Sequence, residues 1–245
     1  RGLGDVYKRQ GLGDQHLDVA AAKLKSKFGM EVKMSEPKIA YREAIRKPVT
    51  IESKYKKQSG GHGQYGHVKI EFEPYDGDEL MFCEKVFGGA VPKNFFPAVE
   101  KGLQEAAEHG SIGGFPVVRL KATLIDGSYH PVDSSEMAFK TAASMAFKDC
   151  MKEAQPYLLE PVDSLKILLP DDKQGDVMSV LSKRRGSVLG MNSVGGGMTE
   201  LLAEAPEAEL GDFALTLRQI TQGLGEFTSE FARYDMLPPG TEIKS

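Results

Sequence analysis

The most unusual segment of the sequence is Ser59 to His67, which reads SGGHGQYGH. Its four glycines permit positive φ angles and a close approach of the backbone to a ligand. No acidic residue lies between positions 53 and 70, and the lysines around the glycines are Lys54, Lys56, Lys57 and Lys69. Basic side chains beside a glycine loop, with Tyr55 and Tyr65 available for stacking, are suited to contact with an RNA backbone.

Two other interpretations of this glycine segment exist, and the sequence argues against the first of them. A nucleotide-binding phosphate loop would need the pattern GxxxxGK[ST] followed by a helix, and the segment has neither. The second interpretation is a long hairpin loop with solvated lysines, which needs no ligand to explain the sequence. Composition alone therefore leaves RNA contact and a plain hairpin loop as the two interpretations.

His130 lies in the turn GSYHPVD, next to Ser134 and Ser135. A histidine beside hydroxyl and carboxylate groups could support acid–base or nucleophilic chemistry, as in a hydrolase that uses Ser134 or Ser135. The same residues also fit a capping box, in which Asp133 caps a helix and Glu136 reaches back to its first turn. Capping already explains these side chains, so we favour it over a catalytic triad.

Three further groups of residues could do chemistry. Lys183 to Gly186, KRRG, is typical of a helix C-terminus with a glycine cap, and its arginines could also contact phosphates. The five histidines show no spacing typical of a metal site, so we predict none. Cys83 and Cys150 are expected to be packed thiols rather than nucleophiles.

The composition of the chain limits the possible classes of protein. Its 245 residues include 31 basic and 35 acidic side chains, for a net charge of −4, which is typical of a globular protein of one or two domains. No apolar run approaches the roughly 18 residues of a membrane helix, and two cysteines fit a reducing cytosol. The charge is uneven, with +4 over residues 38–73 and −6 over residues 198–236. The basic part coincides with the glycine segment.

The first ten residues, RGLGDVYKRQ, match the rest of the chain poorly and have no apolar core of a signal peptide. Asp5 to Gln10 resembles a translated sequencing adaptor, so we interpret residues 1–10 as an artefact or a disordered end. We expect the protein sequence proper to resume near Gly11 and further sequence to lie upstream. Residues 16–28 predict an amphipathic helix and residues 31–34 a strand, which together make half of a domain.

The elements that must position these residues fall into two groups. Between residues 38 and 162 we predict strands at 49–54, 66–72 and 117–125 and helices at 97–109 and 133–154. Beyond residue 162 we predict strands at 164–169, 187–193, 198–205 and around Phe227 and Phe231, with helices at 173–184 and 207–219. The second group has the order βαββαβ of a ferredoxin-like fold, with two helices on one face of a four-stranded antiparallel sheet.

Motifs along the chain resemble the C-terminal portion of bacterial elongation factor G and occur in the order of that family. They are GLGDQHLDV (11–19), YREAIRKPV (41–49), KQSGGHGQYGHVKIEFEP (57–74), GGAVPKNFFPAVEKG (88–102), GSYHPVDSSEMAFK (127–140), LLEPV (158–162), SKRRGSVLG (182–190) and LRQITQGLGEFTSEF (217–231). The resemblance implies an α+β, multidomain chain. Residues 11–37 would be the C-terminal half of the ferredoxin-like domain III, 38–162 the elongated, ribosomal-protein-like domain IV, and 163–245 the ferredoxin-like domain V.

The resemblance also implies a function for the parent protein, a cytoplasmic ribosome-dependent GTPase that moves tRNA and mRNA. GTP and magnesium would bind outside this chain, which is expected to hold no cofactor and to be no enzyme by itself. Domain IV would enter the decoding region of the small subunit, and domain V would contact the GTPase-stimulating region of the large subunit. The tip positions that would face tRNA and mRNA are Ser59, Gly60, Gly61, His62, Gly63, Gln64, Tyr65, Ser128, Tyr129, His130 and Pro131. Candidate ribosomal-RNA contacts are Lys54, Lys56, Lys57, Arg184 and Arg185.

The chain departs from the family pattern at three positions. His62 and Leu224 stand where arginine is usual, and Pro131 follows the tip histidine. These departures resemble the elongation factor G-like paralogues, for which translocation, ribosome recycling and stress are the candidate roles. Two missing cations lower the expected RNA affinity. A tetracycline-resistance ribosomal protection protein and a free-standing RNA-binding module are two further candidates. The glycine segment and the GSYHPVDSS turn favour elongation factor G over the protection protein.

Overall fold

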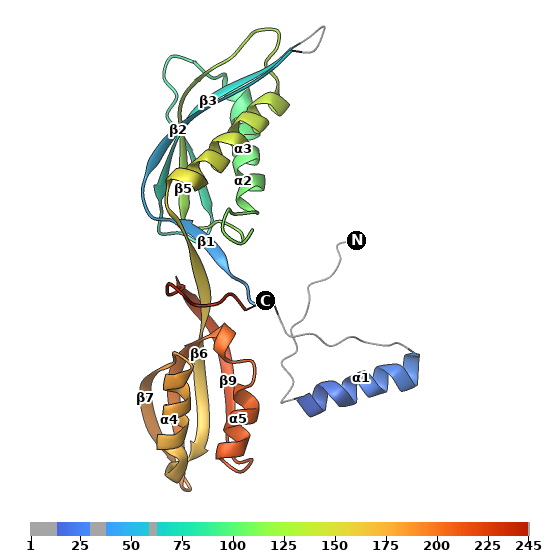
Figure 1. Ribbon diagram of the computed structural model, residues 1–245, viewed down its shortest axis with the longest axis vertical. Coiled ribbons are helices and arrows are strands. Elements are labelled where there is room, and N and C mark those ends of the chain that lie inside the picture. Colours follow the sequence, from blue (N-terminus) through green and yellow to red (C-terminus); the bar gives the residue numbers. More distant parts are fainter. Residues whose placement is uncertain (1–13, 30–37, 59–62, 245) are drawn as a thin grey trace. The chain divides into compact units, whose positions relative to one another are not determined.

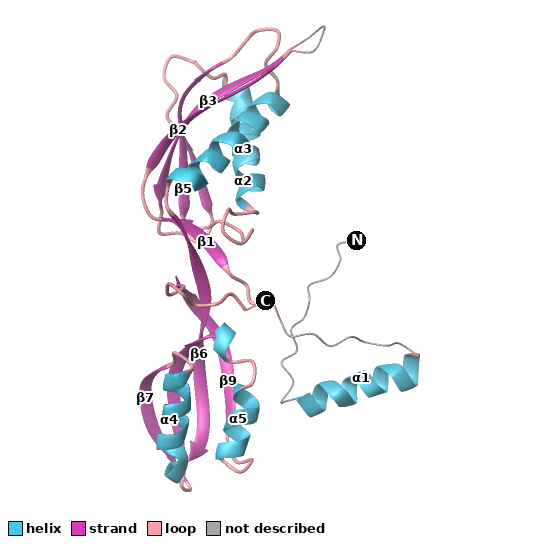
Figure 2. Ribbon diagram, in the orientation of Figure 1, coloured by secondary structure: helices cyan, strands magenta, loops and turns pink. Residues whose placement is uncertain are grey.

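Two units make up most of the chain in the computed structural model, which describes residues 14–29, 38–58 and 63–244. One unit comprises Ala40–Glu160 with Met236–Thr241, and the other is built on Pro161–Asp235. Figure 1 labels most of their elements, and Figure 2 separates helices from strands by colour. Each unit has its own hydrophobic core and is described by itself.

A four-stranded sheet forms the framework of the 40–160 unit. Its strands, in spatial order, are β2 (Val49–Lys57), β3 (Gln64–Pro74), β5 (Leu120–Ser128) and β4 (Leu80–Glu84). β3 runs antiparallel to both β2 and β5, whereas β4 runs parallel to β5. In β3, Val68, Ile70 and Phe72 are fully buried, and the residues between them belong to the other face of the sheet. This alternation confirms the strand predicted from the sequence.

Two helices, α2 (Phe96–Ala107) and α3 (Glu136–Glu153), cover one face of this sheet (Figure 1). A short 3-10 helix (Lys93–Phe95) leads into α2. The helices lie close together because α2 has a glycine at the contact. A Cβ atom on Gly102 would overlap the backbone carbonyl oxygen of Lys140 in α3. The buried side chains of α3 and the sheet then form one core, which includes Phe72, Phe139 and Phe147.

The N-terminus of α3 is capped by Ser135, so the prediction that Asp133 caps this helix was wrong. Ser135 has an extended backbone, and its Oγ accepts a hydrogen bond from the N–H of Ala138 at 3.2 Å. The chain completes a turn through Ser134 first, so the helix begins at Glu136. The carboxylate of Asp133 instead accepts from the N–H of Gly63 at 3.0 Å.

The strand β1 (Arg42–Ile45) carries a buried carboxylate, and the sequence pattern had not predicted this strand. β1 pairs with residues 156–159 of β6 (Pro156–Pro170). Glu43 is fully buried and accepts hydrogen bonds of 2.8 to 3.3 Å from the backbone N–H groups of Ser111, Ile112, Gly113 and Phe115. These donors compensate the cost of burying the charge, and they fix the loop between α2 and β5.

The 161–235 unit has the βαββαβ order predicted from the sequence. After β6 come α4 (Gln174–Lys183), β7 (Ser187–Gly195), β8 (Met198–Pro206), α5 (Phe213–Ile220) and β9 (Glu226–Met236), with short 3-10 helices at Asp171–Lys173 and Glu207–Glu209. β8 lies between β6 and β7 and is antiparallel to both, and β9 also pairs with β6. α4 and α5 lie on one face (Figure 2) and share a core with β6 and β8.

The differences from the prediction in this unit lie at element ends. β6 begins at Pro156 rather than Ser164 because its first residues pair with β1. The helix predicted over 207–219 is divided into a 3-10 turn and α5. Near the N-terminus, the predicted helix is confirmed as α1 (Asp14–Phe28), and the strand predicted at 31–34 lies outside the described residues. None of the helices among the described residues combines the length and the apolar character needed to cross a bilayer.

Candidate functional site

The two tip loops predicted from the sequence meet where β3 begins, just before α3. Asp133 joins them twice, since its Oδ1 accepts from the N–H of Gly63 at 3.0 Å and its carbonyl accepts from the N–H of Tyr65 at 2.8 Å. The hydroxyl of Ser134 donates to the carbonyl of Tyr65 at 2.9 Å. The predicted tip residues Ser59, Gly60, Gly61 and His62 lie outside the described residues. We call the described part, residues 63–67 and 127–134, the tip.

A glycine sets the distance between the tip hairpin and α3. A Cβ atom on Gly66 would lie 2.5 Å from the carbonyl oxygen of Ala138 and 2.6 Å from its carbonyl carbon, at the start of α3. These atoms belong to the backbone of a helix, so they cannot move aside as a flexible side chain would. Only glycine fits this position, and Gly66 has a packing role as well as membership in the glycine segment.

His130 combines a fixed ring nitrogen with an exposed side chain. Its Nδ1 accepts from the backbone N–H groups of Val132 and Asp133 at 3.3 and 3.2 Å. In the neutral imidazole the proton therefore sits on Nε2. The side chain is 51% exposed, so the ring can meet an external partner. The Oδ2 atom of Asp133 lies 3.5 Å from Nδ1.

The hydrolase interpretation of His130 fails on geometry. The Oγ of Ser134 accepts from the backbone N–H of His130 at 2.9 Å and donates to the carbonyl of Tyr65. The Oγ of Ser135 caps α3. Both hydroxyls thus serve the backbone, and among these described residues no serine is paired with the imidazole of His130 as a nucleophile must be with its base.

A second histidine, His67, links three strands on the face of the sheet away from the helices. Its Nε2 lies 2.9 Å from Oε1 of Glu52 on β2, and its Nδ1 lies 2.8 Å from Oγ of Ser128 on β5. The same Oγ lies 2.7 Å from the phenolic oxygen of Tyr65. Neither Glu52 nor His67 was predicted from the sequence as a site residue. The signal was available, because the alternation of β2 and β3 predicts both residues on the polar face.

Lysines surround the phenol of Tyr65. The Nζ of Lys54 lies 5.1 Å from the centroid of the Tyr65 ring, and Lys54 and Lys56 alternate on the exposed face of β2. Lys57, at the end of β2, pairs in register with Gln64, whose Oε1 accepts from the hydroxyl of Tyr55 at 3.0 Å. A hydrogen bond donated by Ser128 lowers the pKa of the Tyr65 phenol, and the two lysines add to this effect, whereas burial raises the pKa.

The arginines of the other unit lie among carboxylates. Arg184 forms a bidentate pair with Asp212, with contacts of 2.5 and 3.1 Å, and also donates to the carbonyl of Glu209 at 2.8 Å and to Oγ1 of Thr216 at 3.0 Å. Arg185 pairs with the carboxylate of Glu209 at 3.2 Å. These bonds join the end of α4 to the segment before α5. The contact of both arginines with ribosomal RNA stays a prediction.

The cysteines and the possible metal ligands give no further candidate site among the described residues. Burial raises the pKa of the Cys150 thiol to about 12, which confirms it as a packed thiol, and Cys83 is free and half-buried. Within the described ranges, no group of three or more His, Cys, Asp or Glu side chains is arranged to hold a metal ion.

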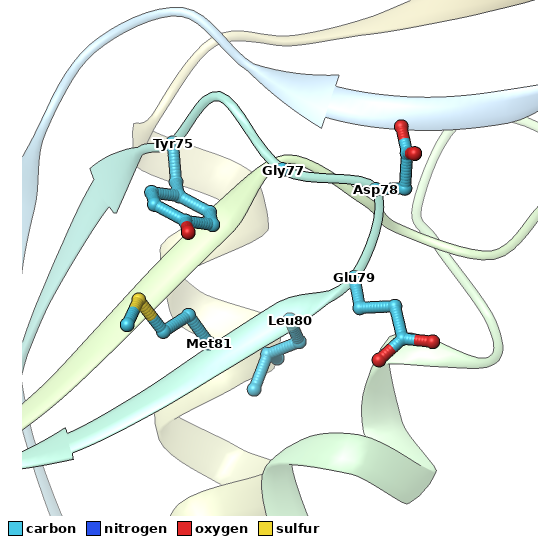
Figure 3. A pocket seen from close by; sticks show the side chains of 6 residues that line it. All are labelled: Tyr75, Gly77, Asp78, Glu79, Leu80 and Met81. Atoms are coloured by element: carbon cyan, nitrogen blue, oxygen red, sulfur yellow. The ribbon is translucent and has the colours of Figure 1, made fainter.

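A shallow hollow of about 350 Å³ lies at the end of the sheet opposite the tip, where β3 turns into β4 (Figure 3). It is lined by Tyr75, Gly77, Asp78, Glu79, Leu80 and Met81. Figure 3 shows the ring of Tyr75 above the side chains of Leu80 and Met81, with the two carboxylates on the other side of the turn. Its lining offers no base paired with a nucleophile, so we do not assign it a catalytic role.

Comparison with known proteins identifies the family. The family model "Elongation factor G, domain IV" matches residues 37–155, and "Elongation factor G C-terminus" matches residues 157–242. The "Elongation factor G-like protein" of Thermotoga maritima is 48% identical over 235 residues, which cover 96% of this chain and 34% of that protein. A crystal structure from Thermus thermophilus superimposes with a TM-score of 0.85 at 46% identity and covers 93% of this chain and 34% of that one. The chain thus spans about a third of the length of these relatives, and it belongs to the elongation factor G family.

Proposed function

We propose that this chain is the ribosome-contacting part of an elongation factor G-type translational GTPase and that its tip faces tRNA and mRNA during translocation. The observation that carries the proposal is the joining of the two tip loops through Asp133 and Ser134. The joined loops bring together an exposed imidazole, a phenol and a pair of lysines at one end of the unit that matches domain IV.

This function requires binding groups at the tip rather than a catalytic side chain. The tip would occupy the space beside the tRNA–mRNA duplex and offer hydrogen bonds to the RNA backbone from His130 and Tyr65. Lys54 and Lys56 supply positive charge next to those groups. GTP and magnesium would bind in another part of the complete protein, in the cytoplasm, so this chain by itself is not expected to hydrolyse GTP.

Two substitutions of His130 test the proposal in the complete protein with 70S ribosomes. In His130→Asn the amide oxygen can still accept the two N–H bonds of the turn, but the distal Nε2 is lost. We expect this variant and His130→Ala to slow translocation about tenfold or more while GTP hydrolysis on the ribosome stays within about twofold. The matched control is His109→Ala, because His109 is an exposed histidine that does not belong to the tip. Equal losses of translocation and GTP hydrolysis would contradict this division of roles.

A role in ribosome recycling is the second candidate, and two observations favour it. The Thermotoga maritima relative is named elongation factor G-like, and this chain lacks the usual arginines at His62 and Leu224. Parallel assays of translocation and of ribosome splitting, with the same complete protein, distinguish the candidates. If the protein splits ribosomes but does not move tRNA, its proposed role changes from translocation to recycling. The proposal that this chain contacts the ribosome would still stand.

A further inference from the structure

Four side chains form one continuous hydrogen-bonded row that ends at the tip. In order they are Glu52, His67, Ser128 and Tyr65. We propose that His67 is a positioning residue, and that its charge state decides whether the Tyr65 phenol offers RNA a hydrogen-bond acceptor or a donor. The inference about RNA rests on the proposed function, whereas the link between His67 and Tyr65 stands on the contacts of this chain alone.

The direction of each hydrogen bond follows from the carboxylate at the far end. Glu52 can only accept, so the Nε2 of His67, 2.9 Å away, carries a proton. The bare Nδ1 of the neutral ring then accepts from the hydroxyl of Ser128, and Ser128 in turn accepts from the hydroxyl of Tyr65. With neutral His67, the phenolic proton therefore points into the row and the lone pairs of the phenol face outward.

A second proton on His67, taken from water, reverses this direction. The Nδ1–H of the imidazolium must donate to Oγ of Ser128, so the Ser128 hydroxyl turns its own proton toward Tyr65. The phenolic oxygen then accepts inside the row, and its proton is free to point outward. No heavy atom needs to move, because hydroxyl protons rotate to suit their partners.

The position of Tyr65 makes this reversal relevant to the tip. Its backbone forms hydrogen bonds with the carbonyl of Asp133 and the hydroxyl of Ser134, and its ring centroid lies 6.4 Å from that of His130. The phenol is therefore close to the group that the proposed function assigns to RNA contact. A donor at this place suits phosphate oxygens, whereas an acceptor does not.

The ring of His67 is open to water and lies among charged side chains of both signs. Its side chain is 19% exposed, so protons can reach it from water. The charged groups on the strands around it are Glu52 and Lys54 on β2, Lys69 on β3 and Asp126 on β5. These neighbours are two carboxylates and two lysines, so charges of both signs lie around the ring.

Nuclear magnetic resonance of the whole 245-residue chain tests the link. Histidine ¹⁵N shifts report the tautomer of His67 between about pH 5 and 8.5, with His67→Gln for assignment, and the Tyr65 ¹³Cζ shift reports the phenol. We expect the Nε2–H tautomer at high pH and a Tyr65 shift whose midpoint equals that of His67. Ser128→Ala should remove this shared midpoint, and Ser128→Thr, which keeps a hydroxyl, should retain it. An Nδ1–H tautomer, or a Tyr65 shift that ignores His67, would overturn the proposal.

Ribosome affinity over the same pH range tests whether RNA forms a hydrogen bond with the Tyr65 phenol. For the wild-type chain we expect binding about threefold to tenfold tighter below the His67 midpoint than above it, the effect of one hydrogen bond. Ser128→Ala should lose this step, although both proteins contain the same histidines. Equal pH profiles would overturn the RNA part of the inference. A wild-type chain that binds no ribosome would refute the proposed function, and the resonance measurement would still decide the role of His67.

Discussion

Lys54 and Lys56 alternate along the exposed face of β2 beside the Tyr65 phenol, whereas Arg184 and Arg185 are held by carboxylates of their own unit. Both groups are clusters of cations near a turn, and the sequence predicted RNA contact for both. Their surroundings differ because residues 38–73 carry a net charge of +4 and residues 198–236 a net charge of −6. The acidic segment supplies Asp212 and Glu209 to the arginines.

The difference shows that residue type indicates only a capacity to bind phosphate. A guanidinium that already donates to Asp212, Glu209 and Thr216 must give up those bonds before it can bind RNA. Among the described residues, the ammonium of Lys54 has no carboxylate partner of this kind, and the group it contacts is Tyr65 of the same tip. We therefore expect substitutions in the arginine pair to affect mainly stability and substitutions at the tip lysines to affect mainly RNA affinity.

The largest effect is expected from Gly66→Ala, which would disrupt the close packing of the tip hairpin against α3. The new methyl group would lie 2.5 Å from the carbonyl oxygen of Ala138, so β3 or α3 must shift. We expect the free energy of unfolding to fall by about 3 kcal/mol, as overpacking of rigid contacts does. Urea unfolding measures it. Gly175→Ala, at a position on α4 with nothing within 4 Å, is the control and should be neutral or stabilising. A loss below about 0.5 kcal/mol at Gly66 would show that the approach to α3 is not rigid.

Arg184→Ala should destabilise the 161–235 unit by about 2 kcal/mol, because it removes a bidentate pair and leaves the carbonyl of Glu209 and the hydroxyl of Thr216 without this donor. Lys183→Ala changes the charge equally at an exposed neighbour and should change stability by less than about 0.5 kcal/mol. Thermal unfolding and ribosome binding are measured on both variants. A loss of ribosome affinity in Arg184→Ala without a loss of stability would favour the RNA contact predicted from the sequence.

The fold could be predicted from the sequence where one periodic pattern dominates. The alternation of β3 and the βαββαβ order of the C-terminal unit are confirmed, because each buries an apolar stripe that the sequence displays. β1 and β4 were missed, since strands of four and five residues show too little alternation. Glu43 gave no signal either. A carboxylate that accepts hydrogen bonds from four N–H groups of a loop 68 to 72 residues away depends on tertiary structure alone.

The candidate site could be predicted in part for the same reason. The glycine segment and the His130 turn stand out by composition, and the structure brings their described residues together. The Asp133 cap was wrong because two serines follow it and either could begin the helix. The row from Glu52 to Tyr65 needs the register of three strands, which places His67 opposite Ser128. No local pattern fixes that register.

Lys56→Gln should weaken ribosome binding without a change in stability, which sharpens the contrast with Arg184. Removal of one phosphate contact lowers the slope of log affinity against log salt by about 0.7 to 0.9. The measurement is a salt titration of the complex between the chain and the ribosome. Lys148→Gln, an exposed lysine on α3, removes the same charge elsewhere and should leave the slope unchanged. An equal change of slope in both variants would indicate a nonspecific effect of net charge.

The smallest effect is a difference in the pH dependence of stability. Arg184 lowers the pKa of Asp212, and although burial raises the pKa of Glu209, hydrogen bonds from Lys244 and Arg185 lower it overall. Carboxyl groups with a lowered pKa bind fewer protons in the folded state. The free energy of unfolding that the two carboxylates contribute is therefore complete above their unfolded pKa of about 4. It is lost as the pH falls through their folded pKa.

Urea unfolding between about pH 2.5 and 7 follows this contribution. The stability difference between wild type and Arg184→Ala should be constant above about pH 5 and should narrow below about pH 4. The narrowing should be small because the side chain of Asp212 is 70% exposed, so water screens the pair. Lys56→Gln, a tip variant with the same loss of charge, should run parallel to wild type over the whole range. If the Arg184 difference also stayed constant to pH 2.5, the ion pair with Asp212 would contribute nothing, and only the hydrogen bonds to Glu209 and Thr216 would hold this arginine.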